Sequence, residues 1–176
     1  KWHEFDDELR EEAARRLLSG EALSAVNVPT ACGKTALIDA AIYAAAYGGA
    51  RRIAFIIDRR VVVDEAFLRA ERIAQALRDA QHPVLRTLAE RLGPIQVTVL
   101  VSTVDQIGSR LLHRGYGVSP WMAPLHAGFV GSRALYLIDE AHLSTCFLAT
   151  VRAAIRHRAE VRVIAMTATP GQTGAA

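Results

Sequence analysis

Short apolar runs rich in β-branched residues alternate along this chain with longer segments of helical periodicity. Such alternation predicts β-α-β units, in which helices join parallel strands and cover both faces of the sheet. The predicted strands are residues 23–28, 52–57, 134–138 and 161–166, and the predicted helices are residues 6–19, 35–47, 61–80, 84–92, 104–113 and 147–157. The sequence therefore predicts an α/β fold with a mostly parallel central sheet flanked by helices.

One apolar run, at residues 95–104, is longer than this pattern allows. It exceeds the ~5–6 residues of a typical strand, and it contains no turn residue. The run is either one long strand or two strands that a deletion has brought together. The second interpretation would remove part of the chain that precedes Ser102.

Composition favours one ordinary globular domain. The chain has 176 residues, of which 51% are hydrophobic and 22% are charged, and this length allows a core without disulfides or a structural metal. Cys32 and Cys146 form no CxxC pair, which argues against a zinc site and for a reducing compartment. No apolar run reaches the ~18 residues that span a membrane, and the charged N-terminal segment gives no sign of a signal peptide. We therefore expect a cytoplasmic protein with no membrane partner, whose net charge of +3 neither requires nor excludes nucleic acid.

The segment NVPTACGKT at residues 27–35 lies between a predicted strand and a predicted helix. A loop in this position binds phosphate through backbone N–H groups and the helix dipole, and we assign Thr30 and Gly33 to that role. Lys34 would contact the β- and γ-phosphates of ATP, and the Thr35 hydroxyl would bind Mg²⁺. The match is incomplete, because the generic pattern has glycine at the position of Val28. Taken alone, the motif could be an accidental loop before a helix.

Two carboxylates follow the predicted strand at residues 134–138, in the segment LYLIDEAHL. Ligands in open α/β sheets bind at the carboxyl ends of the strands. Asp139 would therefore hold Mg²⁺, and Glu140 would act as general base toward the attacking water. His142 would complete the catalytic group, between the γ-phosphate and the next motif. Acids at a helix N-terminus are a structural alternative, but that alternative leaves the joint pattern with the phosphate loop unexplained.

The last predicted strand ends in the segment MTATP at residues 166–170. Thr167 and Thr169 can hydrogen-bond to the DEAH residues and so couple the nucleotide state to a neighbouring domain. A strand exit that contains threonine and proline is common in many folds. The segment supports the functional interpretation only because it follows the DEAH residues at a short distance along the chain.

Together these three motifs resemble helicase motifs I, II and III of superfamily 2, and the resemblance covers nearly the whole chain. It implies a RecA-like P-loop NTPase domain at residues 1–170, with a flexible tail at residues 171–176 that leads toward an absent second RecA-like domain. Two further segments, DRRVVVD at 58–64 and STVDQIGSRLLHRGYG at 102–117, are similar to the CRISPR-associated helicase–nuclease of type I interference. The similarity is closest to the I-G subtype, formerly called I-U.

That family implies ATP and Mg²⁺ as cofactors and movement along single-stranded DNA in antiviral defence. Its partners would be an RNA-guided CRISPR surveillance complex, and a second RecA-like domain and an HD nuclease domain of the same protein. The residues that it assigns to the DNA backbone are Arg59, Arg60, Ser102, Thr103 and Asp105, although the two arginines could belong to a solvated loop. It also implies that the isolated domain binds ATP with little turnover, because the arginine fingers of the second domain are absent.

Departures from the family pattern keep other functions open. Ala31 replaces the glycine of the helicase phosphate loop, and no glutamine-centred adenine motif precedes Asn27. A DEAH-type RNA helicase, or another superfamily 2 motor, would share the same three motifs. A non-catalytic interaction module that keeps a helicase shell is a further alternative, motivated by Ala31 and the suspected deletion.

Overall fold

The computed structural model describes residues 2–19, 25–27, 33–58, 60–156 and 160–167. The strands are β1 (Ala25–Asn27), β2 (Arg52–Ile57), β3 (Thr98–Thr103), β4 (Ala134–Ile138) and β5 (Arg162–Thr167). The helices are α1 (Trp2–Ser19), α2 (Leu37–Ala46), α3 (Arg60–Asp79), α4 (Pro83–Leu92), α5 (Val104–Leu111), α6 (Ala123–Val130) and α7 (Thr145–Ile155), and the short 3-10 helices are η1 (Lys34–Ala36), η2 (Gly93–Ile95) and η3 (Ala141–Leu143).

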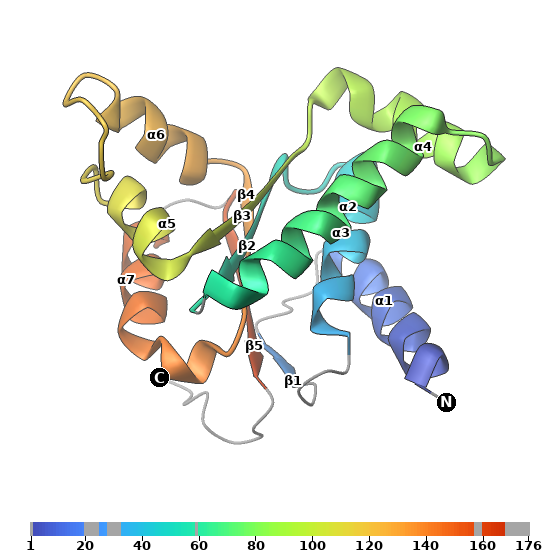
Figure 1. Ribbon diagram of the computed structural model, residues 1–176, viewed down its shortest axis with the longest axis horizontal. Helices are drawn as coiled ribbons and strands as arrows, with labels where there is room; N and C mark the ends of the chain where they lie inside the picture. The colour runs from blue at the N-terminus through green and yellow to red at the C-terminus, as the bar shows by residue number, and fades with distance from the viewer. Residues whose placement is uncertain (1, 20–24, 28–32, 59, 157–159, 168–176) are drawn as a thin grey trace.

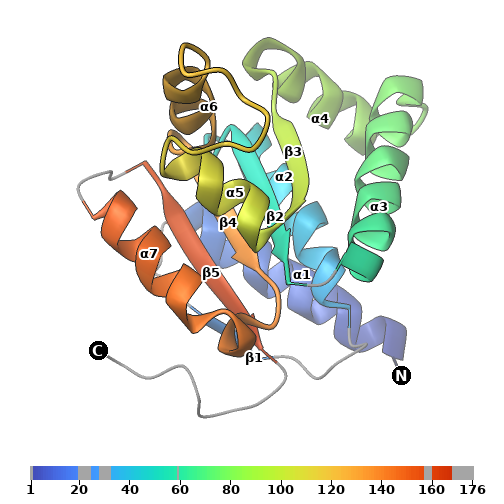
Figure 2. The same ribbon diagram turned by 60° about the vertical axis from the view of Figure 1, so that its left-hand side comes forward.

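The five strands form one parallel sheet in the order β1-β5-β4-β2-β3. From β1 the chain crosses to β2 and then β3 in one direction, and from β3 it returns to β4 and β5 in the other. Because crossovers between parallel strands are right-handed, this reversal puts the connecting helices on opposite faces. Figures 1 and 2 show α2, α3 and α4 on one face with α1, and α5, α6 and α7 on the other.

Alternate side chains of the central strands fill the two halves of the core. Phe55 of β2 and Leu137 of β4 pack into the half beneath α1 to α4, whereas Ile56 and Tyr136 pack into the half beneath α5 to α7. Every side chain of β4 is buried, as expected for a strand covered on both faces. The predicted α/β fold with a parallel central sheet is therefore confirmed.

Two contacts between neighbouring elements stabilise this arrangement. The hydroxyl of Tyr136, which is fully buried, donates a hydrogen bond of 2.5 Å to the carbonyl of Val130 at the end of α6. On the other face, the guanidinium of Arg69 in α3 binds both carboxylate oxygens of Asp39 in α2, at 3.0 and 2.6 Å. The helices on each face are thus joined to the sheet or to each other by specific polar contacts as well as by apolar packing.

The apolar run at residues 95–104 forms neither one long strand nor two strands. Only Thr98–Thr103 is a strand; Ile95 ends η2, and Val104 begins α5. Gln96 has φ 48 and ψ 58, a left-handed conformation that cannot continue an extended strand. The run therefore contains a single strand of ordinary length, bounded by a turn and a helix start.

Helix α6 was not predicted from the sequence. It is short, it contains Pro124 in its first turn, and its apolar residues do not gather on one face, so no helical periodicity marks it. The other predicted helices are present, although α1 begins at Trp2 instead of residue 6 and α7 at Thr145 instead of residue 147. Among the described residues, no helix is long and apolar enough to cross a membrane.

Candidate active site

The carboxyl ends of β1, β4 and β5 meet at one edge of the sheet. The helix that follows β1 lies on one face and the helix that follows β4 lies on the other (Figure 2). Ligands in open α/β folds bind at such a reversal. Gly33, with φ 77 and ψ 23, leads the chain from this edge into η1 and α2. Its left-handed conformation suits glycine, which has no Cβ to clash.

Lys34 is the buried cation of the site. Only 8% of its side chain is exposed, and its Nζ hydrogen-bonds to Oε1 of Glu140 and lies 3.4 Å from Oδ1 of Asp139. A charge this deeply buried is stable only with an opposite charge beside it. The fold thus brings the predicted phosphate loop and the predicted acidic motif into direct contact.

Lys34 is one of only two lysines among the 21 basic residues, the other being Lys1.

Asp139 is held in place by backbone hydrogen bonds. Its N–H donates to the carbonyl of Ile56 in the adjacent β2 at 2.8 Å, and its Oδ1 accepts from the N–H of Glu140 at 3.0 Å. Burial raises the pKa of the Asp139 carboxyl above 3.8. The neighbouring Glu140 charge raises that pKa further, and Lys34 opposes both effects without cancelling them. Burial is thus the main reason that Asp139 holds its proton more tightly than an exposed aspartate.

Glu140 sits at a sharp turn between β4 and η3. Its backbone is left-handed, with φ 44 and ψ 47, which costs a residue with a Cβ roughly 1–2 kcal/mol. Such conformations persist where surrounding contacts hold them, and they gather at functional sites. The turn points one carboxylate oxygen to Lys34 and places the other 3.4 Å from Nδ1 of His142. With 25% of its side chain exposed, Glu140 remains accessible to water.

His142 and Thr167 connect the acidic motif to the next strand. Nδ1 of His142 lies 3.0 Å from the hydroxyl oxygen of Thr167, a hydrogen bond in which either group can donate. Thr167 is 3% exposed at the end of β5, and β5 lies between β1 and β4 in the sheet. The contact predicted between the last strand and DEAH is therefore present for Thr167. Thr169 lies outside the described residues.

The residues at this edge fit a magnesium nucleotide. Thr35 follows Lys34 in η1 and is half-buried. Among the described residues, no group of three or more His, Cys, Asp or Glu side chains could hold a metal by itself. Mg²⁺ in nucleotide sites needs only one or two protein ligands beside phosphate oxygens and waters. The desolvated Asp139 and the hydroxyl of Thr35, the residue after Lys34 in η1, are the two side chains that would hold it.

The predicted DNA-contact residues share this edge but lie away from Lys34. Ser102 and Thr103 end β3, opposite Ile56 and Ile57 of β2, so two strands separate them from β5. Asp105 is exposed in the first turn of α5, and Arg60 begins α3. Arg59 and the phosphate-loop residue Thr30 lie outside the described residues, as does the tail at residues 171–176.

Ile56 is a functional residue that the sequence did not reveal. Its carbonyl fixes the backbone of Asp139, so it sets the position of a carboxylate that it does not touch. A backbone contact between neighbouring strands depends on strand order, and no residue type signals it. The contact between Ile56 and Asp139 follows only from the pairing of β4 with β2.

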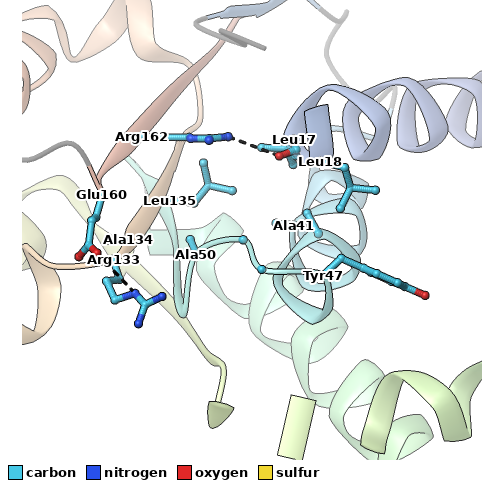
Figure 3. Close-up of a pocket in the computed structure, with 13 residues that line it drawn as sticks. Leu17, Leu18, Ala41, Tyr47, Ala50, Arg133, Ala134, Leu135, Glu160 and Arg162 are labelled. Carbon is cyan, nitrogen blue, oxygen red and sulfur yellow. Dashed lines mark hydrogen bonds and ion pairs between the residues drawn. The ribbon is translucent and has the colours of Figure 1, made fainter. Parts of the chain in front are cut away.

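A separate cavity of about 260 Å³ opens at the opposite, amino edge of the sheet. Figure 3 shows its polar rim, where Nε of Arg133 lies 4.0 Å from Oε1 of Glu160 and Nη1 of Arg162 donates to the carbonyl of Leu17 at 3.4 Å. None of the residues around Lys34 lines this cavity. The two sites are therefore distinct.

Comparison with known proteins identifies the family of the chain. The family described as type III restriction enzyme, res subunit, matches residues 5–172, whereas no curated protein matches. The match includes the phosphate loop, the DEAH segment and all five strands. The protein therefore belongs to the family of the type III restriction enzyme res subunit, and it has the RecA-like fold of a superfamily 2 helicase motor domain.

Proposed function

We propose that this domain binds and hydrolyses ATP to drive movement along single-stranded DNA. We also propose that it belongs to a CRISPR-associated helicase–nuclease of antiviral defence. One observation carries the catalytic part: the buried Lys34 contacts both Glu140 and Asp139, although 106 positions of sequence separate Lys34 from Glu140. The similarity of residues 58–64 and 102–117 to the CRISPR-associated family supports the cellular role.

In this mechanism Lys34 exchanges its carboxylate partners for the β- and γ-phosphates of ATP. Gly33 and Thr30 contribute to the cradle around the phosphates, and the helix dipole of α2 adds to the attraction. Once Lys34 has moved to phosphate, Glu140 loses its strongest hydrogen-bond donor. Its carboxylate is then available to accept a proton from water.

Mg²⁺ would be held by Asp139 and Thr35. When bound, it supplies positive charge that neutralises phosphate oxygens during transfer. Asp139 is suited to this role because its backbone is fixed by Ile56 and its carboxyl is desolvated. The same backbone contact positions the start of the turn that carries Glu140, the next residue.

His142 would transmit the state of this site to β5. Its Nδ1 contacts Thr167 and lies near Glu140, so a shift of Glu140 on nucleotide binding changes the environment of Thr167. Thr169, two residues further along, would carry the signal toward a second RecA-like domain. Arg59, Arg60, Ser102, Thr103 and Asp105 would contact the DNA backbone, with an affinity that falls as salt rises.

The first test is a titration of the domain with a fluorescent nucleotide in the presence of Mg²⁺. We expect wild type to bind, Lys34→Ala to lose binding, and the charge-preserving Lys34→Arg to retain part of it. An ATP analogue with an acylating phosphate adds a chemical readout, since Lys34 and Lys1 are the only lysines. Modification of Lys34 that excess ATP prevents, with Lys1 unaffected, supports the site. Wild type that shows neither binding nor labelling, in the domain and in the full-length protein, contradicts the proposal.

The substrate needs a separate test in the full-length protein. ATP turnover should rise with single-stranded DNA and much less with RNA of the same length. A larger stimulation by RNA would favour a DEAH-type RNA helicase. Nucleotide binding with no stimulation by either polymer would favour an interaction module.

A further inference from the structure

Strand β3 is an edge strand that the rest of the molecule leaves half-covered. All six of its side chains are half-buried, whereas every side chain of β4 is buried. In the part of the chain that the structure describes, β3 pairs with β2 alone. Figure 2 shows it at the margin of the sheet, between α3 and α4 on one side and α5 and α6 on the other.

An apolar groove flanks each face of this strand. On one face, a groove of about 480 Å³ is walled by β3 and by Phe67, Ile73 and Leu77 of α3. On the other, a groove of about 730 Å³ is walled by β3 and by Leu125 and Phe129 of α6. Phe67, Leu125 and Phe129 are 53%, 63% and 40% exposed. Apolar surface of this extent beside a strand edge indicates a place where another chain docks.

The backbone of β3 presents hydrogen-bonding groups to this open side. The N–H of Thr98 donates to the carbonyl of Arg51, toward β2. Because successive residues of a strand alternate in direction, Val99 and Val101 direct their N–H and C=O groups away from β2. The strand carries no charged residue and no proline, and its pairing with β2 is continuous over six residues. It therefore lacks the features by which edge strands avoid association.

The sequence of β3 identifies the chain that would cover it. Read in either direction, Thr98-Val99-Leu100-Val101-Ser102 gives a hydroxyl residue, valine, leucine, valine and a hydroxyl residue. A two-fold axis at Leu100 would place this leucine opposite its own copy, Val99 opposite Val101, and Thr98 opposite Ser102. Each pair matches in chemistry and points to the same face of the sheet. The outward N–H and C=O groups of Val99 would also face those of Val101, as antiparallel pairing requires.

We propose that the protein forms a two-fold symmetric dimer in which β3 pairs antiparallel with β3 of a second copy. The two five-stranded sheets then become one continuous sheet, and each apolar groove is closed by the partner. Ser102 lines one of these grooves, so the dimer and the proposed DNA contact of Ser102 exclude each other. The arrangement uses the same surface on both copies, so it ends at two chains. Because the paired strands run in opposite directions, the two sets of residues around Lys34 lie at opposite edges of the joined sheet.

The mass of the protein in solution tests this proposal. Light scattering after size exclusion should give twice the mass of one chain, to which residues 1–176 contribute 19.1 kDa. Val101→Pro should halve that mass, because it removes an N–H that points away from β2, and proline is tolerated at such edge positions. Val101→Thr keeps both the N–H and the β-branched shape, so it should remain dimeric. Far-ultraviolet circular dichroism of all three proteins checks that the fold is retained.

A charge exchange at the proposed axis tests the register and does not depend on the proline variant. Leu100→Lys and Leu100→Glu should each be monomeric, because identical charges would meet across the axis. An equal mixture of the two should recover the dimer mass. A wild-type monomer at all accessible concentrations overturns the proposal. So does a dimer that survives both Val101→Pro and Leu100→Lys, because its interface lies elsewhere.

Discussion

The hydroxyl oxygen of Thr167 and Nδ1 of His142 lie 3.0 Å apart, at the ends of two strands that are neighbours in the sheet. This contact connects the segment that includes Glu140 to the segment that leaves the domain after β5. Thr167 is almost completely buried, so water cannot replace the contact easily. Loss of this contact should therefore affect the coupling between the nucleotide site and the neighbouring domain more than it affects nucleotide binding.

Thr167→Val should keep basal ATP hydrolysis and lower the stimulation by single-stranded DNA. Valine preserves the shape and removes the hydrogen bond to His142, whose contribution of ~1 kcal/mol corresponds to a roughly fivefold effect. The measurement is the ratio of stimulated to basal turnover in the full-length protein. His142→Ala should reduce that ratio similarly, and the double variant should be no worse than either single one. Additive losses would show that the two residues act separately.

Lys34→Ala should reduce ATP turnover by roughly 10²-fold or more, since removal of one preorganised contact to developing charge costs ~3–4 kcal/mol in comparable sites. It also leaves two carboxylates close together without their cation, so nucleotide affinity should fall as well. Steady-state kinetics of the full-length protein measures both effects. Turnover equal to that of wild type would remove Lys34 from the mechanism.

Glu140→Gln should retain nucleotide binding and lose hydrolysis. Glutamine keeps the size of the side chain and a hydrogen-bond acceptor for Lys34, but it cannot accept a proton from water. General-base catalysis typically contributes 10²–10⁴-fold, and we expect a loss in that range. Binding by fluorescence and turnover by phosphate release should be measured on the same preparation. Near-normal hydrolysis would mean that another group activates the water.

The raised pKa of Asp139 predicts how stability depends on pH. Burial is the main cause, so the folded state holds this proton more tightly than the 3.8 of an ordinary aspartate would imply. The corresponding stability is fully present below 3.8 and is lost as pH rises through the folded pKa. Asp139→Asn removes that loss. The free energy of unfolding of Asp139→Asn, relative to that of wild type, should therefore increase as pH rises from 3.8 through the folded-state pKa of Asp139. Denaturant titrations at several pH values measure this difference.

Lys34→Ala provides the control for this pH effect. Lys34 lowers the pKa of Asp139 in the wild-type protein, so its removal should raise that pKa further. The carboxyl carbon shift of Asp139 in an NMR titration reports the change directly. A midpoint at or below 3.8 in either protein would contradict the assigned cause.

Tyr136→Phe should destabilise the fold without affecting nucleotide binding. The variant removes the buried hydrogen bond to Val130 and leaves a carbonyl with one partner fewer, at a cost of ~1–2 kcal/mol. For a domain of this size that corresponds to a fall in Tm of roughly 2–8 °C. Thermal unfolding followed by circular dichroism measures it. An unchanged Tm would mean that Val130 finds another donor.

Local sequence pattern correctly predicted the strands and helices whose own residue types and spacing are typical of that secondary structure. The β-branched runs at β2, β4 and β5 and the helical periodicity of α3 agree with the structure. The phosphate loop and the acidic motif were predicted to meet, and the contact of Lys34 with Glu140 brings them together. Those predictions succeeded because each rested on residue type and spacing within one segment.

Features that depend on tertiary context were not predictable in this way. The start of β3, shortly after Gln96, depends on a left-handed turn at Gln96, a position that carries neither glycine nor asparagine. Helix α6 has little periodicity because it packs at the margin of the core. The anchoring of Asp139 by Ile56 requires the strand order, which follows from the crossovers and not from any motif.

The paired contact between Arg69 and Asp39 has a mechanical consequence. Helix α2 begins next to Lys34, and α3 begins at Arg60, close to the proposed DNA contacts. Two hydrogen bonds join Arg69, midway along α3, to Asp39 of α2 and hold the two helices at a fixed separation. We therefore expect that a tilt of α2 on nucleotide binding also moves α3. A displacement at the phosphate loop would then reach β3, at the other edge of the sheet.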